Sequence, residues 1–225
     1  MADRKLTAKK KRAAEIIGLL RGEYPDVKCA LIYEKPHELL IATRLSAQCT
    51  DKRVNMVTPA LFERFPGIND FAEADVSEVE EYIRTCGLFK TKAQDIVGMC
   101  RMLRDEYGGK VPDSIEELTK LPGVGRKTAN LIVGDLYGKP AMVCDTHVIR
   151  LSNRLGLADS TDAGVVEKQL REIIPPEEGL NFCHRLVHHG RAVCDARVPK
   201  CGLCVLRNVC PSKDKPVRST RTKKK

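Results

Sequence analysis

The chain has 225 residues, enough for one large domain or two small ones whose apolar core needs no disulfides. Its charged first residues lack the apolar core of a signal peptide, and no later stretch is long and apolar enough to cross a bilayer. The composition therefore excludes a membrane protein and predicts a cytoplasmic one. The net charge of +9 is concentrated in residues 1–12 and 191–225, which favours a polyanionic partner but equally fits solvated tails.

Apolar residues recur at helical spacing through most of the chain, while the alternating pattern typical of strands is absent. Pro36 is placed to open a helix, and Gly108–Gly109 and Pro175–Pro176 separate segments of ordinary helix length. The sequence therefore predicts an all-α protein. Its clearest apolar stripes are Ala13, Ile16, Ile17 and Leu20; Val76, Val79 and Ile83; and Ala93, Ile96, Val97, Cys100 and Leu103.

A helix, a tight turn and a second helix are predicted in the middle of the chain. Asp113 is placed to cap the first helix, with Glu116 completing a capping box, and that helix must end before Pro122. Gly123 and Gly125 permit positive φ angles in the turn, and Gly125 opens the second helix. The amides of such a hairpin suit a backbone phosphate, although glycine-rich turns also join helices that bind nothing. The apolar stripe of the second helix is Ala129, Ile132, Val133 and Leu136.

Two ionisable residues near the hairpin are candidates for chemistry. Lys127 projects opposite the apolar stripe, near a helix N-terminus, where partial desolvation beside Leu131 would make its amine a usable nucleophile. A plain solvated lysine fits the same position. Asp145 precedes an apolar stripe that begins at Val148, so helix capping explains it as well as catalysis does. His147 is expected to be structural.

Four of the ten cysteines are close together in the sequence and predict one metal site. They are Cys194, Cys201, Cys204 and Cys210, separated by six, two and five residues. In a reducing compartment this cluster favours zinc or an iron-sulfur cluster over disulfides, and the spacing alone does not decide between the two. Arg197, Lys200 and Arg207 lie between the cysteines, so the site can order a basic surface against a phosphate backbone. The remaining cysteines are expected to be small buried hydrophobes: Cys29, Cys49, Cys86, Cys100, Cys144 and Cys183.

Taken together, the cysteine cluster and three short motifs resemble endonuclease III, a family of bifunctional DNA glycosylases. The motifs are Leu-Ser-Ala-Gln-Cys-Thr-Asp at 45–51, Leu-Pro-Gly-Val-Gly-Arg-Lys-Thr-Ala-Asn at 121–130 and Val-Cys-Asp-Thr-His at 143–147. The likeness runs from about Ala13 to Cys210.

The resemblance implies an all-α, two-lobed helix-hairpin-helix fold with a DNA groove between the lobes. A six-helix barrel would occupy residues 29–139. An iron-sulfur lobe would be built from residues 1–28 and 140–210, followed by a basic disordered tail at 211–225.

The resemblance also assigns roles to individual residues. It implies that Lys127 is the Schiff-base nucleophile, that Asp145 is the catalytic carboxylate, and that the four clustered cysteines hold a [4Fe-4S] cluster. Gln48 and Leu88 match wedge positions that would fill the gap left by a flipped nucleotide. The other positions expected to contact DNA lie in the hairpin: Leu121, Gly123, Gly125 and Arg126.

The implied activity is base excision repair of DNA, in which an N-glycosylase releases oxidised or damaged pyrimidines and a lyase step then cuts the strand by β-elimination. The expected partner is double-stranded DNA carrying damaged pyrimidines or abasic sites. The expected protein is a monomer that binds no membrane and that, in a bacterium, associates with the nucleoid. A monofunctional glycosylase would lack the hairpin lysine. A non-catalytic DNA-binding module with a zinc knuckle would need neither Lys127 nor Asp145.

Overall fold

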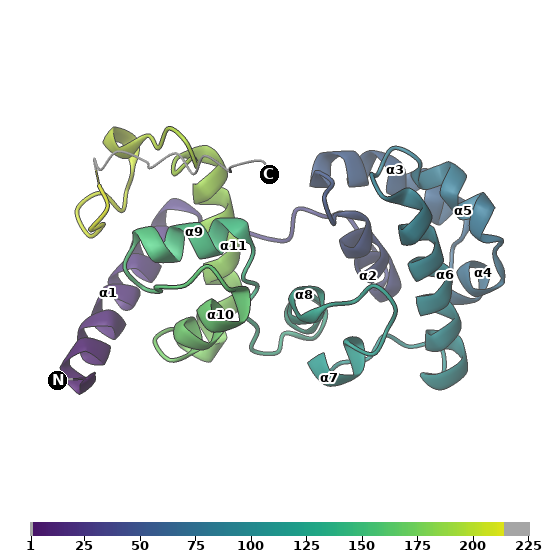
Figure 1. Cartoon of the computed structure of the whole chain (residues 1–225), viewed down its shortest axis with the longest axis horizontal. Helices are drawn as coiled ribbons and strands as arrows, with labels where there is room; N and C mark the ends of the chain where they lie inside the picture. The colour runs from purple at the N-terminus through teal and green to yellow at the C-terminus, as the bar shows by residue number, and fades with distance from the viewer. Residues whose placement is uncertain (1, 214–225) are drawn as a thin grey trace, which may run out of the picture. The chain divides into compact units, whose positions relative to one another are not determined.

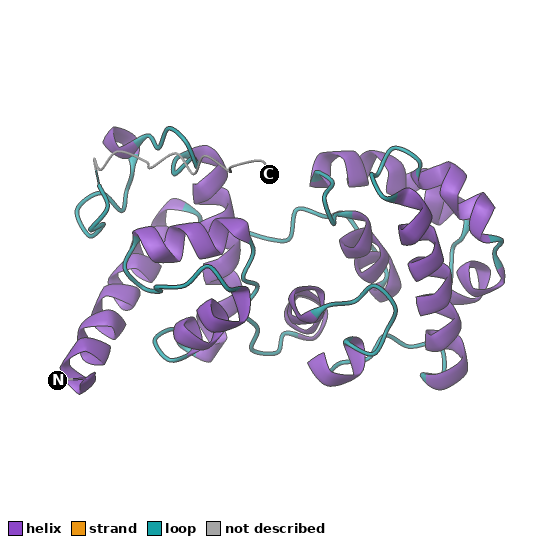
Figure 2. Ribbon diagram, in the orientation of Figure 1, coloured by secondary structure: helices purple, strands orange, loops and turns teal. Residues whose placement is uncertain are grey.

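The computed structural model of the chain describes residues 2–213, and within them it contains helices and loops but no strand (Figure 2). The predicted all-α fold is confirmed. The described residues form two compact units, which we call the central unit (Cys29–Lys139) and the terminal unit (residues 2–28 and 140–213). The basic tail predicted for residues 211–225 lies outside the described residues from position 214 onward. No helix in the described part of the chain is long and apolar enough to span a membrane.

The central unit is built around its longest helix, α6, against which α2, α4 and α5 pack (Figure 1). Helix α2 also contacts α3 and α8, and α7 packs on α8. Pro36 opens α2, as the sequence predicts. Phe65 and Phe71 stack with ring centroids 5.0 Å apart and are both fully buried in this core. The helices of this unit are α2 (Pro36–Leu45), α3 (Asp51–Arg64), α4 (Ile68–Glu73), α5 (Val76–Ile83), α6 (Phe89–Glu106), α7 (Ile115–Leu118) and α8 (Arg126–Tyr137).

The start of α7 differs from the sequence-based prediction. Ser114, not Asp113, is the N-cap, and its hydroxyl oxygen accepts a hydrogen bond from the backbone N–H of Glu117 at 3.2 Å. The Asp113 carboxylate instead accepts a hydrogen bond from Lys139 Nζ at 2.6 Å, beyond the end of α8. Both residue types are good caps, but the Asp113 carboxylate is occupied by Lys139, and the Ser114 hydroxyl caps the helix.

The terminal unit joins the first and the last described segments of the chain in one core. Helix α11 packs against α1 and α9, and α9 also contacts α10 (Figure 1). The hydroxyl group of Tyr24, which follows α1, lies 3.1 Å from Nδ1 of His189 on α11, and Arg185 Nε donates a hydrogen bond to the Tyr24 carbonyl at 3.1 Å. The helices here are α1 (Ala2–Glu23), α9 (Thr146–Arg154), α10 (Ala163–Arg171), α11 (Gly179–Ala192) and the short 3-10 helices η1 (Pro176–Glu178) and η2 (Cys201–Leu203).

The six isolated cysteines do not all behave as the sequence predicts. Four are buried hydrophobes, namely Cys86, Cys100, Cys144 and Cys183. Burial raises the pKa of Cys100 to about 12, as expected of an inert core thiol. Cys29 and Cys49 are only partly buried, so the prediction was wrong for these two.

Candidate functional site

The predicted hairpin between α7 and α8 is present, and its turn depends on one glycine. Gly123 has φ +71°, in the left-handed region that glycine adopts most easily, and the backbone N–H of Val124 donates a hydrogen bond to the Leu121 carbonyl at 3.1 Å. Gly125 has φ −94° and is the extended N-cap of α8, so it opens the second helix as predicted, and Gly123 alone supplies the positive φ of the turn. The Leu121 and Val124 side chains are buried and anchor the turn, while Gly123 and Gly125 are exposed.

An ion pair from two other helices supports the hairpin from inside. Arg44 on α2 donates a hydrogen bond through Nε to Asp95 on α6 at 2.7 Å. A Cβ atom on Gly123 would lie 2.6 Å from Arg44 Nε and 2.8 Å from Asp95 Oδ2, so any side chain there would force this ion pair to shift. The hairpin backbone therefore rests directly on this ion pair, and the position requires glycine for its packing as well as for its φ angle.

The first turn of α8 has the features of an anion site with a free amine beside it. Its N–H groups have no intrahelical acceptor, and no acidic residue lies in the first turn. Lys127 is the second residue of the helix and is exposed, while Ala129, Ile132 and Val133 face the core. Leu136, the last residue of the predicted stripe, is only partly buried. Because Lys127 itself is exposed, the described residues do not provide the partial desolvation expected for its amine.

Gln48 and Leu88 share an unusual backbone conformation. They are the only non-glycine residues with positive φ in the described part of the chain, at 53° and 57°. Both side chains are exposed, and that of Leu88 remains 58% accessible. A Cβ on Gly87 would lie 3.8 Å from the Gln48 carbonyl oxygen, so the two loops are in contact. Two strained, exposed residues on touching loops are typical of a functional site, because such strain persists only where the surroundings impose it.

Asp145 is the N-cap of α9 in the terminal unit. Its Oδ1 accepts hydrogen bonds from the backbone N–H groups of His147 and Val148, both at 2.8 Å, while Oδ2 accepts none from the described residues. The carboxylate is partly exposed. The capping role that the sequence allowed is confirmed, and one carboxylate oxygen is left for a ligand. Lys127 and Asp145 belong to different units.

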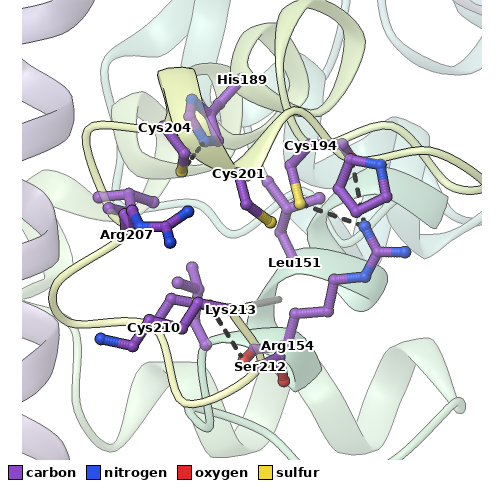
Figure 3. Close-up of a pocket in the computed structure, with 13 residues that line it drawn as sticks. Leu151, Arg154, His189, Cys194, Cys201, Cys204, Arg207, Cys210, Ser212 and Lys213 are labelled. Atoms are coloured by element: carbon purple, nitrogen blue, oxygen red, sulfur yellow. Dashed lines mark hydrogen bonds between the residues drawn. The ribbon is translucent and has the colours of Figure 1, made fainter. Parts of the chain in front are cut away.

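The four clustered cysteines line one cavity of about 320 Å³ in the terminal unit (Figure 3). Burial, together with the nearby thiols, raises the pKa of Cys204. Within residues 2–213, no three or more His, Cys, Asp or Glu side chains converge in the arrangement that holds a single metal ion. The donor set nevertheless suits a sulfur-rich cluster, since four thiols from one short segment face the same space.

Two polar side chains from neighbouring helices contact these sulfurs. Arg154 at the end of α9 donates to Cys194 Sγ at 3.2 Å and to the Asp195 carbonyl at 2.7 Å. His189 Nε2 on α11 lies 3.2 Å from Cys204 Sγ (Figure 3). Such outer contacts stabilise thiolate charge and orient the ligands. Sequence reasoning missed both residues, because neither lies within the cysteine segment and an ordinary arginine or histidine on a helix carries no signal.

Comparison with known proteins agrees with this arrangement. The profile of the HhH-GPD superfamily of base excision DNA repair proteins matches residues 41–176. Endonuclease III of Synechocystis is 50% identical over 210 residues, which cover 93% of this chain and 96% of the relative. Two solved structures, a non-covalent endonuclease III–DNA complex and a trapped endonuclease III–DNA covalent intermediate, are each 44% identical with a TM-score of 0.87. Each match covers 92% of this chain and 97% of the solved chain. The chain therefore belongs to the endonuclease III family, within the HhH-GPD superfamily of base excision DNA repair proteins.

Proposed function

We propose that this DNA glycosylase, acting as a monomer, releases oxidised or otherwise damaged pyrimidines from duplex DNA and then cuts the strand through a Schiff base on Lys127. One observation carries the proposal. An exposed lysine occupies the first turn of the hairpin helix in a chain 44% identical to a protein trapped as a covalent DNA intermediate. A lysine amine is the side chain best suited to form a covalent adduct with a sugar carbon and release it again.

The chemistry assigns one task to each of two side chains. The free amine of Lys127 attacks the anomeric carbon of the damaged nucleotide, and the base leaves with the electron pair of its glycosidic bond. Positive charge develops on the sugar in that step, and the Asp145 carboxylate stabilises it. The unbonded Oδ2 supports this role, because Asp145 caps α9 with Oδ1 alone.

Strand cutting follows from the same covalent bond. After the base has left and the sugar ring has opened, Lys127 is joined to the sugar as a protonated imine. This imine withdraws electrons and acidifies the neighbouring C2′ proton. Removal of that proton forms a C2′–C3′ double bond and expels the 3′ phosphate with the electrons of its C–O bond. One nucleophile thus serves both base release and strand cutting.

The hairpin and the two strained loops supply the binding surface. The N–H groups of the first turn of α8 have no acceptor within the helix, and Gly123, Gly125 and Arg126 are exposed beside them. This surface suits a backbone phosphate and fixes position on the duplex without reading sequence. Leu121 is buried, and its carbonyl accepts the hydrogen bond from Val124 N–H, so its proposed part in DNA binding is to hold the turn in place. Gln48 and Leu88 present exposed side chains that would occupy the gap left by a flipped nucleotide.

Cys194, Cys201, Cys204 and Cys210 would hold a [4Fe-4S] cluster, supported by the shared cavity and by the contacts from Arg154 and His189. When bound, such a cluster crosslinks the segment that carries its ligands. In this proposal it takes no part in the chemistry at the lesion. It keeps Arg197, Lys200 and Arg207 on a folded surface available to a phosphate backbone.

The test is a duplex with one oxidised pyrimidine, incubated with the protein and borohydride. We expect a covalent protein–DNA adduct with borohydride, and base release with strand cutting in a parallel incubation without it. Lys127→Gln should abolish adduct and cutting but keep lesion binding, whereas Lys110→Gln, which changes another exposed lysine, should behave as the wild type. Base release without cutting would indicate a monofunctional glycosylase, and an adduct formed by Lys127→Gln would transfer the reaction to another amine.

A further inference from the structure

Lys92 on α6 is an unexpected core residue. Its side chain is completely buried, and no other lysine in residues 2–213 is buried. Its Nζ donates hydrogen bonds to the carbonyl oxygens of Leu45 at 2.8 Å and of Cys86 at 2.9 Å. Burying an ammonium group is costly unless it is well paired, and an apolar side chain could fill the same space. The position therefore suggests a role for the two bonds themselves.

The two carbonyls lie just before Gln48 and Leu88 in the sequence, one at the end of α2 and one in the loop before α6. Leu45 is the last residue of α2, three positions before Gln48, and a helix's final carbonyls lack intrahelical donors. Cys86 lies two positions before Leu88. The ammonium also faces the partially negative C-terminal end of α2. Burial lowers the pKa of Lys92, Cys49 and Cys86 oppose that shift, and the Arg44 guanidinium adds to it.

We infer that Lys92 is a positioning residue that locks the Gln48 and Leu88 loops to one another, so that both side chains enter the duplex as one rigid unit. This inference rests on the proposed function of these loops as wedges. A single ammonium bonded to both loops fixes their spacing more tightly than either loop's own hydrogen bonds would. Preset spacing matters because inserting both side chains must offset the cost of unstacking the duplex.

The same stretch of α6 also supports the hairpin. Asp95 lies one turn after Lys92 and holds Arg44 against Gly123. Residues three apart occupy the same side of a helix, so one face of α6 contacts both wedge loops and, through Arg44, the hairpin. This face of α6 therefore links three segments that are proposed to touch DNA.

The test compares excision from a fully paired lesion with excision from the same lesion inside an unpaired bubble. Lys92→Met keeps the unbranched shape of the side chain, one atom shorter, but removes all donors. We expect single-turnover excision to fall on the order of 10- to 100-fold on the paired substrate and to change little in the bubble. The fluorescence of a 2-aminopurine beside the lesion should show reduced unstacking. Lys168→Met, which changes an exposed lysine on α10, is the control for charge.

A second control separates positioning from general instability. Leu103→Ala removes a fully buried side chain from the other end of α6 and lowers the melting temperature without touching either loop. At a melting temperature matched to that of Lys92→Met, it should slow excision from both substrates alike. Equal losses on paired and bubble substrates in Lys92→Met would overturn the inference. If Lys92→Met does not fold, Lys92→Gln, which retains an amide donor, should show a smaller loss confined to paired DNA, and equal losses there would count against it too. Failure of the proposed function would appear differently, as a wild-type protein that excises neither substrate.

Discussion

Leu88 is an exposed leucine held in a left-handed backbone conformation at the N-cap of α6. A non-glycine residue there costs about 1–2 kcal/mol, and glycine relieves that cost. We therefore expect Leu88→Gly to melt at or above the wild-type temperature. Its excision rate on paired DNA should nevertheless fall at least about tenfold, because unstacking requires a wedge. Single-stranded substrate should be processed normally. Equal activity on both substrates would remove the wedge role and leave the strain without a functional reason.

Asp145 combines a confirmed capping role with a proposed catalytic one, and a single substitution separates them. Asparagine caps helices about as well as aspartate, so Asp145→Asn should keep its melting temperature while base release slows on the order of 100-fold. Asp162→Asn makes the same change at the N-cap of α10, where Oδ1 accepts a hydrogen bond from Val165 N–H, and should leave both quantities unchanged. Normal turnover by Asp145→Asn would mean that Asp145 is only a cap.

At the residue scale, the sequence predicted the functional residues that belong to short motifs. It missed residues whose partners come close only in the folded chain. Lys127 and Asp145 stand out because short motifs surround them. Lys92 had a visible signal, since it directly precedes Ala93 and lies four residues before Ile96 on an apolar stripe. That pattern predicts burial but not its purpose. The partners of Lys92 are carbonyl groups, which every residue possesses, so no sequence pattern indicates them.

At the level of elements, the short helix α7 shows how local rules are overridden by distant contacts. The sequence predicted a helix between 113 and Pro122 and placed its cap one residue too early. We expect Ser114→Ala to cost about 1 kcal/mol, or roughly 2–4 °C in melting temperature. Asp113→Ala should cost less, because its carboxylate is exposed and binds only Lys139. Calorimetry on the two variants checks this order, and a larger loss for Asp113→Ala would restore Asp113 as the stronger determinant of the helix start.

The hairpin shows the same limit. Two glycines around one residue were sufficient to predict a tight turn and the start of α8. The support beneath the turn was not predictable, because Arg44 and Asp95 come from two separate helices and meet only after folding. The requirement for glycine at 123 therefore has two causes, the positive φ angle and the adjacent ion pair, and only the first can be anticipated from turn chemistry.

At the scale of the whole molecule, apolar periodicity predicted helices but not their partners. Nothing in the local pattern around Lys28 or Lys139 marks the division between the two units, and the two-lobed prediction came from the family resemblance. The contact between Tyr24 and His189 joins residues at opposite ends of the chain. Tyr24 directly follows α1 and His189 lies on α11, so their pairing follows from the packing of α1 on α11 and not from either segment alone.

The terminal unit should depend on its cluster for stability, because its last segment after α11 contains only the three-residue helix η2 within the described residues. Anaerobically purified protein should contain iron and sulfide in equal amounts and should be brown. Cys204→Ser should lose that colour, bind duplex DNA less tightly and melt at a lower temperature, because ligand bonds contribute directly to folding. Cys29→Ser changes a partly buried cysteine of the central unit and should retain full iron content. The [4Fe-4S] assignment predicts no zinc, so stoichiometric zinc without sulfide in the wild-type protein would contradict it while leaving the four-cysteine site itself in place.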